Sequence, residues 1–185
     1  MTGLSLSAYI SSKIFVLGVL CLIQSLLITG VFSAFVGVPE EGIFMNSFLE
    51  LLLTTFITAV ASAAMGLMVS SLFTNADRAM TVAPILLMPQ ILFSGLIFKL
   101  DGATELISWL AVCRFSMEGY GTTANLNELP LKLQQEGVMI PHEAEDFFEY
   151  TTGHLLSSWG ILLAFTVIFL LLARMVLGKI GKEKS

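Results

Sequence analysis

The stretch from Pro84 to Tyr120 constrains the fold of this chain more than any other part of the sequence. It starts as an apolar run, which Pro89 interrupts and a Phe93-Ser94-Gly95 turn ends. A second apolar segment, Glu105 to Val112, follows and is too short to cross a bilayer. A spanning helix needs about 20 residues to cover roughly 30 Å of hydrocarbon. We therefore expect residues 104–120 to form a re-entrant segment, which must lie against protein or water at that depth.

The composition indicates an integral membrane protein. Of the 185 residues, 56% are hydrophobic and only 12% are charged, whereas charged residues make up about 25% of a typical soluble domain. We expect an all-α fold with four transmembrane helices, the re-entrant segment and a large external loop.

The order of apolar and polar segments predicts the topology. The predicted spans are residues 14–35, 48–73, 80–98 and 159–176. Residues 1–13 form a cytoplasmic lead-in, residues 99–158 an external loop that contains the re-entrant segment, and residues 177–185 a cytoplasmic tail. The third span contains Pro84 and Pro89, which remove backbone donors and bend a helix.

Lysine and arginine set the predicted orientation, because the cytoplasmic segments of membrane proteins carry an excess of these residues. With the N-terminus inside, six of the nine basic residues are cytoplasmic and three are external. The six are Lys13, Arg78, Arg174, Lys179, Lys182 and Lys184, and the three are Lys99, Arg114 and Lys132. Both termini are therefore predicted to be cytoplasmic.

The second span contains a face of small residues. Ser62, Gly66 and Ser70 recur every four positions, a spacing that lets two helix backbones approach closely. The simpler interpretation is packing against a neighbouring helix, and the alternative is that this face lines the path of a permeant.

Arg114 and Glu118 lie four residues apart, so their charges can meet on one helix face. At a membrane boundary such a pair partly neutralises itself. The pair is predicted to be a structural clip in the re-entrant segment, and the alternative is a hinge at an outer gate.

The sequence offers no catalytic residues, so we expect no enzyme. It has no Gly-rich phosphate-binding loop, and any ATP chemistry would therefore reside in a partner domain. Histidines and carboxylates crowd the segment from His142 to His154, but an acidic solvated helix above Phe147 and Phe148 explains them more simply than a metal site. No block of like charge suggests binding to nucleic acid.

Several motifs resemble the membrane domain of ABC transporters of the ABCG (White) subfamily, also called type-2 ABC permeases or type V exporters. The segment LFSGLIFKL at residues 92–100 is similar to the end of the fifth span of that family. The segments ELISW and CRFSMEGYGTTANLNEL, within residues 105–129, are similar to its re-entrant segment and the start of its third external loop. The segment LSAYISSK at residues 6–13 is similar to the lead-in to its third span, so the resemblance covers nearly the whole chain.

This resemblance implies that the four predicted spans correspond to spans three to six of the family. It places Met88, Ile91 and Leu92 on the substrate pathway, and Leu96 and Ile97 in an apolar gate between the inner cavity and the exit. It also implies homodimers or heterodimers of permease domains in a lipid bilayer, an ATP-binding cassette domain that binds ATP and Mg, and a small-molecule or lipid-like substrate.

The resemblance also carries expectations about the source of the chain. The nucleotide-binding domain and the first two family spans are missing from this sequence, so we expect a fragment of a longer half-transporter or the product of a truncated reading frame. The external loop has no cysteine in its long polar part and no Asn-x-Ser/Thr site, which favours a bacterial plasma membrane. The alternative function is that of a membrane binding or assembly subunit that does not itself transport.

Overall fold

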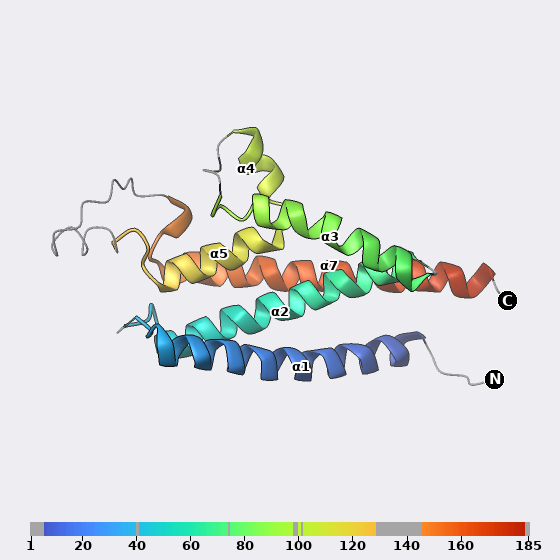
Figure 1. Ribbon diagram of the computed structural model, residues 1–185, viewed down its shortest axis with the longest axis horizontal. Helices are drawn as coiled ribbons and strands as arrows, with labels where there is room; N and C mark the ends of the chain where they lie inside the picture. Colours follow the sequence, from blue (N-terminus) through green and yellow to red (C-terminus); the bar gives the residue numbers. More distant parts are fainter. Residues whose placement is uncertain are drawn as a thin grey trace.

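The computed structural model describes residues 6–39, 41–73, 75–97, 100, 102–128 and 146–183, and within these ranges the regular structure is entirely helical. The helices lie mostly along one long axis, as an elongated bundle (Figure 1). They are α1 (Leu6–Phe35), α2 (Ser47–Leu72), α3 (Ala76–Leu92), α4 (Ala103–Ser108), α5 (Val112–Thr123), the 3₁₀ turn η1 (Asp146–Phe148) and α7 (Thr152–Glu183).

Three helices are long and apolar enough to cross a membrane. The candidate spans are Ser11–Phe35 in α1, Ser47–Leu72 in α2 and Thr152–Gly178 in α7. The predicted spans 14–35 and 48–73 agree with the first two to within a few residues. The last span was predicted to begin at residue 159, but α7 begins at Thr152, because the Thr151 hydroxyl accepts a hydrogen bond from the His154 amide and caps the helix.

Helix α3 is shorter than the predicted span 80–98. It has 17 residues and ends at Leu92, three residues after the second of its two prolines. At 1.5 Å per residue it covers about 26 Å, somewhat less than the roughly 30 Å of a bilayer core. Residues 98 and 99 lie outside the described part of the chain. The third predicted span, at residues 80–98, stays a prediction.

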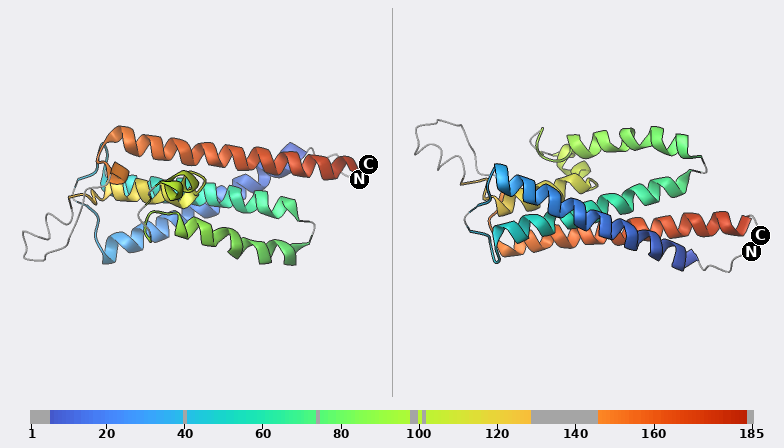
Figure 2. Two further views of the ribbon diagram at one scale, coloured as in Figure 1. Left: turned by 90° about the horizontal axis from the view of Figure 1, so that it is seen from above. Right: turned by 60° about the horizontal axis from the view of Figure 1, so that its bottom comes forward.

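The start of α1 and the end of α7 lie at the same end of the bundle in every view (Figures 1 and 2). This arrangement agrees with two termini on one side of the membrane. Which side faces the cytoplasm stays a prediction from the distribution of basic residues.

The turn before α2 is closed by a buried carboxylate. Glu50 is fully buried, and its Oε1 accepts hydrogen bonds from the amides of Phe44 and Met45 at 3.0 and 3.1 Å. A Cβ atom at Gly42 would lie 2.0 Å from the carbonyl oxygen of Met45, so this close turn requires glycine. Glu50 therefore holds the turn against the first turn of α2.

The core lies where α2, α5 and α7 meet. Its fully buried apolar residues are Ala61 on α2, Val112 and Phe115 on α5, and Leu162 on α7. The predicted re-entrant segment 104–120 is built from two short helices, α4 and α5, joined by a turn at residues 109–111. Helix α5 lies alongside α2 and α7, whereas α4 projects beside the end of α3 (Figure 1). Residues 129–145, the middle of the predicted external loop, lie outside the described residues.

Candidate functional site

The predicted gate follows the sharp turn that ends α3. Ser94 is buried, and its hydroxyl donates to the carbonyl of Ile91 at 2.7 Å, which closes the last turn of the helix. Gly95 has φ +86°, and a Cβ atom there would lie 3.0 Å from the ring of Phe147. The conformation and the neighbouring ring both require glycine at this position. The turn fixes the direction in which the chain leaves α3.

Leu96 and Ile97 come directly after this turn and are exposed, with 66% and 52% of their surface accessible. The predicted pathway residues Met88, Ile91 and Leu92 on α3 are exposed as well. The structure therefore places the five residues along one continuous segment, but no other part of the described chain covers them. A closed pathway would need a second wall from outside the described residues.

A single hydrogen bond between side chain and main chain joins α3 to α5 among the described residues. The side-chain oxygen of Gln90 accepts from the Cys113 amide at 3.3 Å. Gln90 lies in the last turn of α3, next to Pro89. It connects the helix of the predicted pathway to the N-terminus of α5.

Arg114 clips α4 to α5. It is 6% exposed, and its Nη1 donates to the carbonyl of Glu105 at 3.1 Å and to the Ser108 hydroxyl. Its guanidinium carbon also lies 4.8 Å from the ring centre of Trp109 and 5.7 Å from that of Phe147, distances typical of cation–π contacts. The guanidinium therefore donates hydrogen bonds to a carbonyl and a hydroxyl near the C-terminal end of α4, and it holds the two short helices together.

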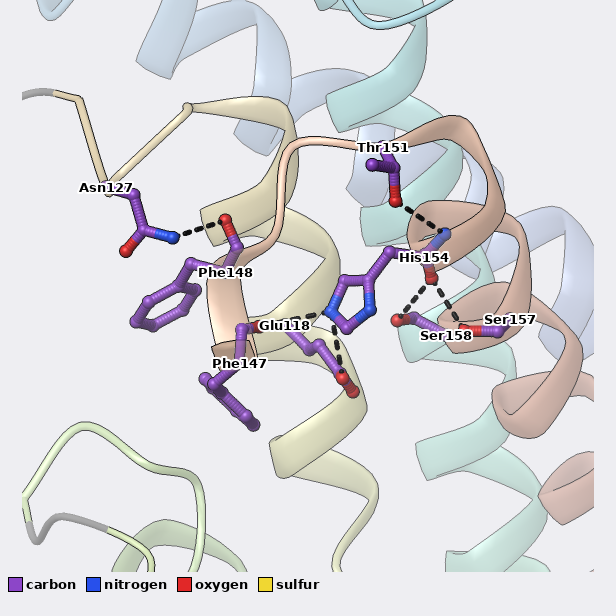
Figure 3. A network of polar contacts seen from close by, with 8 residues as sticks. All are labelled: Glu118, Asn127, Phe147, Phe148, Thr151, His154, Ser157 and Ser158. Atoms are coloured by element: carbon purple, nitrogen blue, oxygen red, sulfur yellow. Dashed lines mark hydrogen bonds and ion pairs between the residues drawn. The ribbon is translucent and has the colours of Figure 1, made fainter. Parts of the chain in front are cut away.

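Glu118 contacts a histidine of another helix. Its Oε1 lies 3.0 Å from Nε2 of His154 at the start of α7. The same Nε2 lies 3.2 Å from the carbonyl oxygen of Phe147 in η1. Figure 3 shows the imidazole ring pointing toward both oxygens. A carbonyl oxygen can only accept, so Nε2 carries the hydrogen.

Glu118 is buried, and the 12-residue helix α5 that carries it is too short to span the membrane. Burial raises the pKa of the Glu118 carboxyl above its ordinary value, while His154 and Arg114 act to lower this pKa. Its second oxygen, Oε2, is buried without a hydrogen-bond partner among the described residues. In place of the predicted pair between Arg114 and Glu118, the described residues show two separate contacts: Arg114 binds α4, and Glu118 contacts α7.

Hydroxyl groups anchor α5 to α2. The Tyr120 hydroxyl donates to Thr55 at 2.8 Å, and the Thr58 hydroxyl donates to Ser116 at 3.0 Å. The backbones of α5 and α2 approach closely at Gly119, which lies between Ser116 and Tyr120 on α5. A Cβ atom on Gly119 would lie only 3.0 Å from the Thr54 methyl group. These hydrogen bonds let a polar helix pack against a span.

The ABC-2 type transporter family model matches residues 1–127. This chain belongs to that family. As an ABC-2 type transporter membrane domain, it is a multi-pass membrane protein and the permease component of an ABC transporter. A comparison with curated proteins found no match. The family match covers α1 to α5 and ends before α7, so His154 lies beyond the matched part.

The small-residue face of this ABC-2 domain is not used for packing within the described chain. Ser62, Gly66 and Ser70 are exposed, and a Cβ atom on Gly66 would meet no atom within 4 Å. The small residues of α2 that do pack are Ala61 and Ala64, which are buried. The predicted packing at Ser62, Gly66 and Ser70 would therefore require a helix from outside the described residues.

Sequence reasoning did not assign roles to three threonines of α2: Thr55 and Thr58, which anchor α5, and Thr54, whose hydroxyl accepts a hydrogen bond from the Trp159 indole of α7. Their spacing of one and four residues on a span was an available signal, since hydroxyl residues in spans often bond to neighbouring helices. Across the described part of the chain, no group of three or more histidine, cysteine or acidic residues could hold a metal ion. His142, Glu143 and Glu145, which belong to the acidic segment of the sequence, lie outside the described residues.

Proposed function

We propose that this permease domain forms the substrate pathway of an ABCG-like exporter, and that it works by alternating access. The observation that carries the proposal is the exposed apolar segment of α3 and its turn, from Met88 to Ile97, in a chain of the ABC-2 type transporter family. The ATP-binding cassette component would bind ATP and Mg, and its closure would supply the energy.

The proposed gate is the apolar pair Leu96 and Ile97. An apolar constriction loses its water and blocks polar leak without a charged barrier. The turn at Gly95 fixes the position of Leu96 and Ile97 relative to α3, which supports a gate confined to these two residues.

We further propose that two permease domains, identical or different, face each other across this segment. The support is that Met88, Ile91 and Leu92 form an exposed apolar surface, which the described residues do not cover. An apolar pathway of this kind fits a small-molecule or lipid-like substrate, and the proposed membrane is a bacterial plasma membrane. If the domain is ABCG-like, its spans correspond to spans three to six of that subfamily.

The test is a paired substitution in the assembled transporter. We expect Leu96→Ala with Ile97→Ala to raise the passive leak of carboxyfluorescein from proteoliposomes several-fold in the absence of ATP. The matched control is Leu106→Ala with Ile107→Ala, the same pair of residue types exposed on α4. The control should leave the leak at the wild-type level. An unchanged leak in the Leu96→Ala, Ile97→Ala variant would show that these two residues are not the gate.

A second function is favoured by one observation, the exposed small-residue face of α2. An assembly subunit that does not transport would use Ser62, Gly66 and Ser70 to bind a partner helix. The two functions differ in ATP turnover: a transporter component changes the ATPase rate of its cassette partner, and an assembly subunit leaves this rate unchanged.

A further inference from the structure

The contact between Glu118 and His154 joins three elements at one point. Glu118 comes from α5, His154 from the first turn of α7, and the carbonyl of Phe147 from η1. The side chains of His154 and Glu118 are only 18% and 11% exposed. Two serines of α7, Ser157 and Ser158, donate to the His154 carbonyl and hold this turn of the helix (Figure 3).

Other charged and titratable groups lie near the pair on three segments. On α5, Arg114 lies one turn away; its Nη1 binds the Glu105 carbonyl and Ser108 rather than the Glu118 carboxylate, and its charge opposes the rise in the Glu118 pKa without exceeding the effect of burial. On α2, the Oε1 of Glu50 is engaged by the amides of Phe44 and Met45. In the segment between η1 and α7, Glu149 and Tyr150 are exposed.

We propose that Glu118 and His154 form a proton-binding site that locks α5 to α7. The dissociable proton is carried either by the Glu118 carboxyl or by the second ring nitrogen of His154, while the hydrogen on Nε2 stays in place. With this proton the pair has no net charge. When the proton leaves to water, the pair keeps one negative charge in a largely buried junction, which is unfavourable.

The direction of the pH effect follows from the contacts. Burial favours the protonated form of Glu118 and raises its pKa in the closed junction. A group whose pKa is raised by closure stabilises the closed state at low pH. This stabilisation is lost as the pH rises through the raised pKa. The lock therefore tightens on acidification and loosens in alkali. One proton changes the ratio of closed to open junctions by at most about tenfold per pH unit.

Hydrogen–deuterium exchange of α5 in the full chain in lipid nanodiscs tests this proposal. After correction for the intrinsic exchange rate, we expect protection of residues 112–123 to fall several-fold between pH 5 and pH 9, by at most about tenfold per pH unit. Glu118→Gln, which keeps the shape without the charge, should abolish this pH dependence. Glu149→Gln, which removes an exposed carboxylate nearby, should preserve it. An equal pH dependence in wild type and Glu118→Gln, or none in wild type, would overturn the proposal.

A second measurement needs no substitution at the site. The chain has two histidines, His142 and His154, so histidine-selective ¹⁵N labelling gives two sets of ring signals, which His142→Gln assigns. Groups that share a proton titrate together. The His154 signals should therefore show two inflections with pH, one of them reporting Glu118. A single inflection at His154 would show that the two side chains do not share a proton-binding site.

Discussion

Helices α3 and α5 follow each other closely in the sequence but are held in opposite ways. No described side chain of α3 is buried, although the helix is strongly apolar. Nine of the twelve residues of α5 are buried, although many of them are polar. The apolar helix lies at the surface of the bundle and the polar one lies inside it.

The difference shows where this fold places its specific contacts. Helix α5 is joined to α2 by hydroxyl pairs, to α7 by Glu118 and to α4 by Arg114. Helix α3 contains Pro84 and Pro89, and its described side-chain link to α5 is the Gln90 contact. We infer that α2, α5 and α7 form a fixed unit, and that α3 is the element that can move against it.

The largest effect should come from opening the core around α5. Phe115 is 1% exposed and contacts the rings of Trp109 and Phe165. Phe115→Ala should lower the free energy of unfolding by about 3 kcal/mol, because a buried ring is lost and a cavity remains. Met88→Ala on exposed α3 is the comparison and should change stability by less than about 0.5 kcal/mol. Unfolding in detergent mixtures measures both, and equal losses would contradict the contrast between the two helices.

A smaller effect should come from one hydroxyl of the α5 anchor. Tyr120→Phe removes the hydrogen bond to Thr55 and should cost about 0.5–1 kcal/mol in the same assay. Tyr150→Phe makes the same chemical change at an exposed position and should leave stability unchanged. If the two variants behave alike, the hydroxyl contacts do not hold α5 in place.

The sequence was sufficient to predict the spans α1 and α2 and the turn at Phe93–Gly95. Continuous apolar runs and the glycine that follows the third of them are local signals, and the structure has helices and a turn at these places. The predicted interruption at Pro89 was wrong, because α3 continues through both prolines to Leu92. The segment 104–120 was predicted to be too short to cross the membrane, and the structure forms it from two short helices, α4 and α5.

The burial of α5 could not be predicted from its own residues. Its Ser116 is buried and its Tyr120 half-buried, and both bond to α2, at Thr58 and Thr55, which are 58 and 65 residues away in the chain. Likewise, the spacing of Arg114 and Glu118 places them on one helix face, but each binds a different element. Periodicity identifies the face of a helix, and the tertiary fold decides which neighbour covers it.

The central claim, that α3 moves against a fixed unit of α2, α5 and α7, can be tested by pulsed EPR distances in the assembled transporter. Spin labels at Ser62 and Ile85 report α2 to α3, and labels at Ser62 and Met117 report α2 to α5, with Cys21 and Cys113 replaced by alanine. We predict that ATP with vanadate shifts the first distance distribution and leaves the second unchanged. A shift of the second distribution as large as the first would contradict the claim.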